Sequence, residues 1–236
     1  MKIGILVTGA VDDDLCEEFG PYSDMFIDWL GRRPGVTYTC FDTTFGELPA
    51  RPHDHDAYLI TGSPSGVHDP ELWIPRLSDF VRAAHDAGCK LVGICFGHQL
   101  LAHALGGRVT RSPRGWGAGT AESRVLQTKP WMQPMKPSIR LLVTHQDQVV
   151  ALPPGAEVLL GNEFCPFDVV QYSAHALSMQ GHPEHPRAYT SALVERRRSS
   201  YPPGVYERAR ETLTLPTDET IVASWVWSFL GADEPR

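Results

Sequence analysis

Apolar residues in the first half of the chain come in short continuous runs, which are typical of strands buried on both faces. The runs occupy residues 2–8, 36–41, 57–61 and 90–94. Between them, residues 21–31 and 71–87 carry apolar side chains at helical spacing and end at glycines. A further helical pattern follows residue 95. This alternation predicts a mostly parallel, doubly wound α/β sheet with helices on both faces.

The second half of the chain has a different pattern, in which short strand candidates alternate with Pro- and Gly-containing loops. These candidates are residues 121–127, 139–143, 157–160 and 176–180, and we expect them to add antiparallel strands. Two helices are expected within 186–236. We find no internal repeat, low-complexity tract or long linker, so we predict a single domain over 1–236.

Composition and net charge indicate a globular protein and disfavour some classes of binding partner. Apolar residues make up 42% of the chain and charged residues 21%, which fits an ordinary globular protein. The net charge of −7 disfavours nucleic acid or an anionic membrane as a partner. We interpret the basic run at 196–198 as the solvated face of a helix. No signal peptide or bilayer-spanning run is evident.

The five cysteines are scattered and form no C-x-x-C pair, so they predict neither a disulfide framework nor a zinc finger. A reducing, cytoplasmic location is therefore expected. One of them, Cys95, lies in the sequence Gly93-Ile94-Cys95-Phe96-Gly97, between an expected strand and an expected helix. This spacing follows the logic of the G-x-S-x-G nucleophile turn, in which glycines let neighbouring chain pass close. The helix N-terminus favours a thiolate, and the Phe96 N–H points where an oxyanion could form.

A thiol nucleophile needs a base, and the base needs a group that orients it. The segment Gln180-Gly181-His182-Pro183-Glu184 offers both. His182 can share the thiol proton, and Glu184 can hold the other ring nitrogen. His182 and His185 form an H-x-x-H pair, but no third ligand is evident from spacing, so we expect no metal.

These residues resemble a known family. Residues 93–99 and 180–184 resemble the two signature blocks of class I (triad) glutamine amidotransferases. Residues 61–64 resemble the oxyanion loop of that family, and residues 144–149 resemble a block of GMP synthetase amidotransferase domains and their stand-alone relatives. Residues 19–30 resemble the first helix of those relatives, so the resemblance covers residues 1–185 in order.

The resemblance implies a flavodoxin-like fold and hydrolysis of a γ-glutamyl amide. Cys95 would form a γ-glutamyl thioester, His182 would protonate the leaving amine and then activate water, and Glu184 would orient His182. The backbone N–H groups of Ser63 and Phe96 would form the oxyanion hole. The substrate-binding residues implied by the same blocks are Gly62, Gln99, His145, Gln146 and Asp147. No cofactor is expected.

Three functions remain open at this point. The first is release of ammonia from glutamine, with an unidentified synthetase or acceptor subunit as partner. The second is a γ-glutamyl peptidase acting on glutathione-like compounds, and the third is a regulatory or binding module without turnover. No pyrophosphatase loop occurs, so the chain alone is not expected to make GMP. Ser63 replaces the second glycine of the family's oxyanion loop, and serine adopts positive φ poorly.

Overall fold

The apolar runs of the first half form parallel strands. In the computed structural model, which describes residues 1–232, these strands are β1 (Lys2–Val7), β2 (Thr37–Asp42), β3 (Ala57–Ile60) and β4 (Lys90–Ile94). Successive side chains alternate between the two faces of the sheet. In β1, Ile3 and Ile5 pack into one core cluster, and Leu6 packs into another on the opposite face. Burial on both faces explains the continuous apolar runs of β1, β3 and β4, whereas the residues of the edge strand β2 are half-buried or exposed.

One nine-stranded sheet forms the centre of the molecule, in the order β2-β1-β3-β4-β11-β10-β9-β6-β7. The first five strands are parallel, and each later strand is antiparallel to the one before it. The strands of the second half are β6 (Gly117–Val125), β7 (Ser138–His145), β9 (Glu157–Gly161), β10 (Val169–Ser173) and β11 (Ala176–Met179). The expected antiparallel addition at 176–180 is therefore wrong for β11, which pairs parallel with β4.

A smaller, two-stranded sheet was not expected from the sequence. It pairs β5 (Arg108–Arg111) antiparallel with β8 (Asp147–Ala151). β7 ends at His145 and β8 begins at Asp147, so only Gln146 lies between the two strands. The residues predicted to bind substrate therefore lie at this junction.

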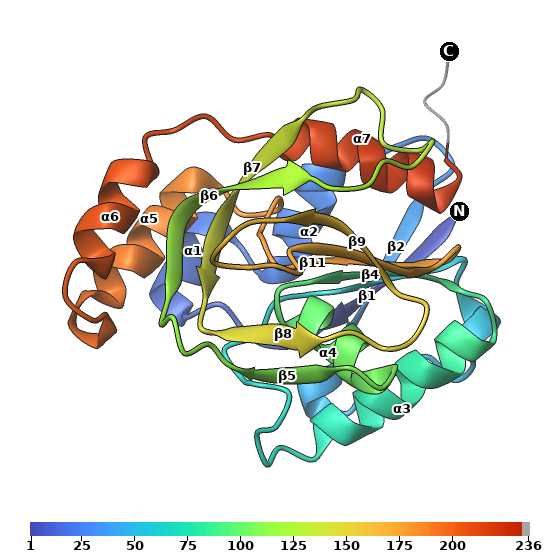
Figure 1. The fold of residues 1–236 in the computed structure, drawn as a ribbon. Helices are drawn as coiled ribbons and strands as arrows, with labels where there is room; N and C mark the ends of the chain where they lie inside the picture. The colour runs from blue at the N-terminus through green and yellow to red at the C-terminus, as the bar shows by residue number, and fades with distance from the viewer. Residues whose placement is uncertain (233–236) are drawn as a thin grey trace.

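Helices cover both faces of the large sheet (Figure 1). α2 (Tyr22–Leu30) and α7 (Glu219–Leu230) pack on one face, and α3 (Trp73–Asp86) and α4 (Phe96–Ala104) pack on the other. α1 (Asp13–Phe19), α5 (Arg187–Arg196) and α6 (Val205–Thr212) gather at one end. Short 3₁₀ turns occupy Thr43–Phe45, Pro52–Asp54 and Arg198–Ser200.

Two helix expectations need correction. Three α-helices follow residue 185, not two, and α1 lies in the segment after β1 whose Asp and Gly residues are typical of a loop. Asp13 and Asp14 begin α1, where acidic side chains favour the positive end of the helix dipole. The predicted mostly parallel α/β fold with antiparallel additions is otherwise confirmed. Residues 233–236 of the predicted domain lie outside the described residues. No helix in residues 1–232 is both long and apolar enough to cross a bilayer.

The carboxyl ends of the parallel strands bring distant segments together. Thr8 follows β1, residues 61–63 follow β3, Cys95 follows β4 and residues 180–184 follow β11. Because parallel strands end at the same edge of the sheet, all four segments meet there. Open α/β sheets bind their ligands at this edge.

Candidate active site

Cys95 sits on a strained turn between β4 and α4. Its φ of 53° and ψ of −101° make it the one non-glycine residue with positive φ in the described part of the chain. Such strain persists only where the surroundings enforce it. A Cβ added at Gly93 would lie 2.3 Å from the Gly97 carbonyl oxygen, and one at Gly97 would lie 2.4 Å from that of Ile60. The two glycines are therefore required by close backbone approach, as the sequence pattern predicts.

His182 and Glu184 form a buried hydrogen-bonded pair. His182 Nδ1 lies 2.8 Å from Glu184 Oε1, and both residues are only 4% exposed. A Cβ added at Gly62 would lie 3.0 Å from His182 Cε1 and 3.7 Å from Cys95 Cβ, so these two side chains meet over Gly62. Burial by itself lowers the pKa of His182, but the charges of Cys95 and Glu184 outweigh it and raise that pKa above its ordinary value. The site therefore favours a protonated imidazole.

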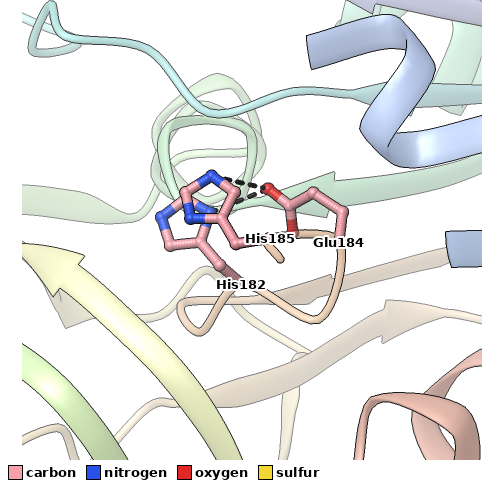
Figure 2. A group of neighbouring side chains, drawn as sticks. All are labelled: His182, Glu184 and His185. Atoms are coloured by element: carbon pink, nitrogen blue, oxygen red, sulfur yellow. Dashed lines mark hydrogen bonds and ion pairs between the residues drawn. The ribbon is translucent and has the colours of Figure 1, made fainter. Parts of the chain in front are cut away.

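His185 stacks on His182 (Figure 2). Their ring centroids are 3.9 Å apart and their planes differ by 10°, while His185 Nε2 lies 3.5 Å from Glu184 Oε1. Burial and the charge of His182 hold the pKa of His185 well below its usual value, so this ring stays neutral.

The ligand atoms of His182, Glu184 and His185 lie within 4.8 Å of one another, which could suggest a metal site. A zinc ion bound to a histidine lies in the ring plane, about 2.0–2.1 Å from the nitrogen. Two nearly parallel stacked rings cannot both contain the ion in their planes. The arrangement therefore fits a stacked hydrogen-bonding group better than a metal centre.

The predicted oxyanion loop, residues 61–64, is tied to the end of β1 by Thr8. The Thr8 N–H donates to Thr61 Oγ1 at 3.0 Å, and the Thr8 hydroxyl lies 3.0 Å from the carbonyl oxygen of Thr61 and 2.9 Å from that of Gly62. Thr8 and Thr61 are fully buried. Sequence reasoning missed Thr8, because a threonine after a strand belongs to no recognisable motif.

Ser63 does not need the conformational freedom of glycine. It is not among the positive-φ residues of the described chain, and its Oγ accepts the N–H of Ser65 at 3.1 Å. The loop thus forms its turn with a side-chain hydrogen bond. The N–H groups of Ser63 and Phe96 donate to no protein acceptor within residues 1–232, which leaves both available.

A cavity of about 190 Å³ opens over Cys95. It is smaller than the roughly 300–1,000 Å³ of drug-sized ligand sites, so it suits a small substrate. The predicted site residues that line it are Ser63, Cys95, Gln99, His145, Gln146 and Asp147. A second cavity of about 360 Å³ borders the other side of His182 and Glu184 but does not reach Cys95. Because Cys95 is the predicted nucleophile, the smaller cavity is the candidate substrate site.

Gln99 and His145 contact the backbone at the start of β8. The Gln99 side-chain amide donates to the Asp147 carbonyl oxygen at 2.8 Å and to Gln180 Oε1 at 3.1 Å. His145 Nδ1 lies 3.3 Å from the same carbonyl oxygen, and burial lowers the pKa of His145 to about 4. These contacts fix the backbone of Asp147 at the cavity wall.

Arg197 lies at the cavity, where the sequence did not place it. The interpretation of residues 196–198 as a solvated helix face is wrong for this residue, because α5 ends at Arg196 and Arg197 lines the Cys95 cavity. At the end of a helix, the helical period no longer indicates which way a side chain points. The sequence pattern therefore could not place Arg197 at the cavity.

Comparison with known proteins gives the family. The model of the class I glutamine amidotransferase family matches residues 31–195, and the chain belongs to this family. Gamma-glutamyl peptidase 4 of Arabidopsis thaliana is 28% identical over 200 residues, which cover 81% of this chain and 79% of that protein.

A glutamine-hydrolysing GMP synthase of Thermus thermophilus is 35% identical over 137 residues, covering 56% of this chain and 25% of that protein. The solved structure of a glutamine amidotransferase from Thermotoga maritima superposes with a TM-score of 0.73 at 20% identity, covering 98% of each chain. The predicted family and fold are both confirmed.

Proposed function

We propose that this protein hydrolyses γ-glutamyl amides through a thioester on Cys95. The observation that carries the proposal is the strained Cys95 beside the buried His182–Glu184 pair. Strain is expected where a nucleophile must project from a strand–helix turn. An isolated structural cysteine would need neither the positive φ nor the neighbouring pair.

The chemistry proceeds in two steps. The Cys95 thiolate attacks the γ-carbonyl carbon, the S–C bond forms, and the C–N bond breaks as protonated His182 gives its proton to the leaving amine. Water then attacks the thioester, His182 takes a proton from it, and the C–S bond breaks to release glutamate. Glu184 keeps the imidazole in the required tautomer and stabilises its charge.

The oxyanion of each tetrahedral intermediate would bind the backbone N–H groups of Ser63 and Phe96. Glycine at position 62 leaves room for His182, because a side chain there would press on its ring. The cavity wall at Gln146 and Asp147 would contact the α-amino and α-carboxylate groups of the glutamyl unit.

The leaving group is best assigned as the amine of a peptide. The similarity to a γ-glutamyl peptidase extends over 81% of this chain, whereas the similarity to a GMP synthase covers 56%. The second candidate is glutamine, whose ammonia would pass to a synthetase or acceptor subunit. A module without turnover is disfavoured because Cys95 on its strained turn lies near the buried, hydrogen-bonded pair of His182 and Glu184.

The test compares γ-glutamyl dipeptides, glutathione and glutamine as substrates of the full chain. We expect glutamate release from the γ-glutamyl peptides, with a higher kcat/KM than from glutamine, and none from the Cys95→Ala protein. A Cys16→Ala protein is the matched control, since Cys16 lies outside the cavity. Turnover that survives Cys95→Ala would refute the nucleophile, and a preference for glutamine would favour the second candidate.

A further inference from the structure

Three consecutive arginines follow one another at the end of α5, and each has a different environment. Arg196 forms ion pairs with Asp12 and Asp14. The Arg198 guanidinium lies over the Tyr206 ring, 4.7 Å from its centroid. Arg197 alone of the three lines the cavity that holds Cys95.

The guanidinium of Arg197 is held in place but carries an unneutralised charge. Its Nη1 donates to Thr144 Oγ1 at 2.6 Å, and its Cζ lies 5.6 Å from the centroid of the Trp116 ring. Both contacts are with uncharged groups, and no carboxylate in residues 1–232 pairs with it. Partial burial of a cation without a counter-ion costs free energy unless a ligand supplies a negative charge.

The remaining charges of the cavity lie on other segments. Asp147 pairs with Arg111, whose Nε lies 3.8 Å from Asp147 Oδ1, and Asp69 accepts the Gly66 N–H at 2.7 Å. Asp69, Arg111 and Asp147 also line the cavity. The cavity thus presents one fixed, unpaired cation together with carboxylates, which is complementary to a zwitterionic amino-acid derivative.

We propose that Arg197 anchors a carboxylate of the γ-glutamyl substrate and thereby determines specificity at the Cys95 cavity. This inference rests on the proposed function. An arginine fits the role because its planar fork can bind a carboxylate through two N–H groups, and Nη1 is the only nitrogen occupied by Thr144. The contacts with Thr144 and Trp116 orient the fork before substrate arrives, which reduces the entropic cost of binding.

Two substrate carboxylates could provide this chemistry, the α-carboxylate of the glutamyl unit and the terminal carboxylate of the leaving peptide. Matched pairs of substrates distinguish them. The first pair is γ-glutamyl-glycine and its derivative with an amidated glutamyl α-carboxyl group. The second pair is γ-glutamyl-glycine and γ-glutamyl-glycinamide, which lacks only the terminal carboxylate.

The experiment measures KM and kcat for these substrates with the wild-type chain and with Arg197→Gln. Loss of a charge-assisted hydrogen-bonded contact should raise KM for γ-glutamyl-glycine on the order of 10- to 100-fold, with kcat changed far less. Arg197→Gln should lose the wild-type preference for the acid over the amide in one of the two pairs, and that pair identifies the anchored carboxylate. Arg197→Lys should restore part of the preference, because it keeps the charge but not the fork.

Arg196→Gln and Arg198→Gln are the matched controls and should keep both KM and the preference for the acid. If Arg197→Gln folds, as shown by its circular dichroism, and keeps the full preference in both pairs, the anchor is refuted. Calorimetric binding of the same compounds to Cys95→Ala and to Cys95→Ala/Arg197→Gln separates the two proposals. Acid-selective binding that depends on Arg197, without turnover by the wild type, would retain the anchor and reject the proposed hydrolysis.

Discussion

The hydroxyl of Thr8 offers a sharp test of how the predicted oxyanion loop is held in place. Thr8→Val keeps the shape of the side chain and removes the hydroxyl that contacts the carbonyl oxygens of Thr61 and Gly62. Neither oxygen is left without a donor, since the Thr61 oxygen also accepts from the Gly97 N–H and the Gly62 oxygen from the Thr61 hydroxyl. The expected loss is therefore one net hydrogen bond, about 0.5–1.5 kcal/mol of unfolding free energy.

Thr120→Val is the matched control, because Thr120 is also buried but its hydroxyl has no hydrogen-bond partner in the described chain. Removing an unsatisfied buried hydroxyl should leave stability unchanged or raise it. In urea unfolding, Thr8→Val should therefore lower the free energy of unfolding, whereas Thr120→Val should leave it unchanged or raise it. In thermal unfolding, each 1 kcal/mol corresponds to roughly 2–4 °C for a chain of this length.

Activity adds a second readout to the same pair. Displacement of the loop should lower kcat of Thr8→Val by about tenfold to a hundredfold, because small errors in the position of an oxyanion donor are expensive. Thr120→Val should keep wild-type kcat. Equal stability and equal kcat in the two variants would refute the idea that Thr8 fixes the loop.

The remaining predictions concern the Cys95 turn, the His182–Glu184 pair and a buried acid. Glu184→Gln should fold normally but lose roughly 10⁴-fold in kcat, because the amide favours the wrong tautomer of His182; a loss below tenfold would contradict the orienting role. Gly97→Ala should destabilise by about 1–3 kcal/mol in urea unfolding, since its Cβ would lie 2.4 Å from the Ile60 carbonyl oxygen, and this outweighs the helix-propensity gain of about 1 kcal/mol. If Gly97→Ala were as stable as the wild type, the turn could not be as tight as the structure indicates. Burial raises the pKa of Asp168 from 3.8 to about 6, so the folded state keeps a proton that the unfolded state releases. As pH rises from about 4 to 6, the free energy of unfolding of the wild type should therefore fall relative to that of Asp168→Asn. If the two free energies changed with pH in the same way, the pKa of Asp168 would not be raised by burial.

The strands β1, β3 and β4 could be predicted from the sequence because burial on both faces makes nearly every residue of a strand apolar. The sequence could not predict the direction of β11, since 176–179 reads the same whether the strand runs parallel or antiparallel to β4. The β5–β8 sheet also escaped prediction. Its pairing joins segments about 40 residues apart, and each strand is too short to show a distinct pattern.

The candidate site divides in the same way. Cys95 and the pair His182 and Glu184 could be predicted because each lies in a short motif whose spacing reflects a local turn. Thr8 and Arg197 could not, because their places depend on contacts with residues far away in sequence, such as Thr61 and Thr144. Those contacts exist only after the sheet edge has brought the segments together.

The most direct test of the central claim is detection of the thioester itself. Rapid quenching of the full chain during turnover of a γ-glutamyl dipeptide, followed by mass spectrometry of its peptides, should find one γ-glutamyl group on the peptide that contains Cys95. The adduct should disappear in Cys95→Ala and persist in Cys16→Ala. Turnover without any adduct on Cys95, or an adduct on another residue, would contradict the account.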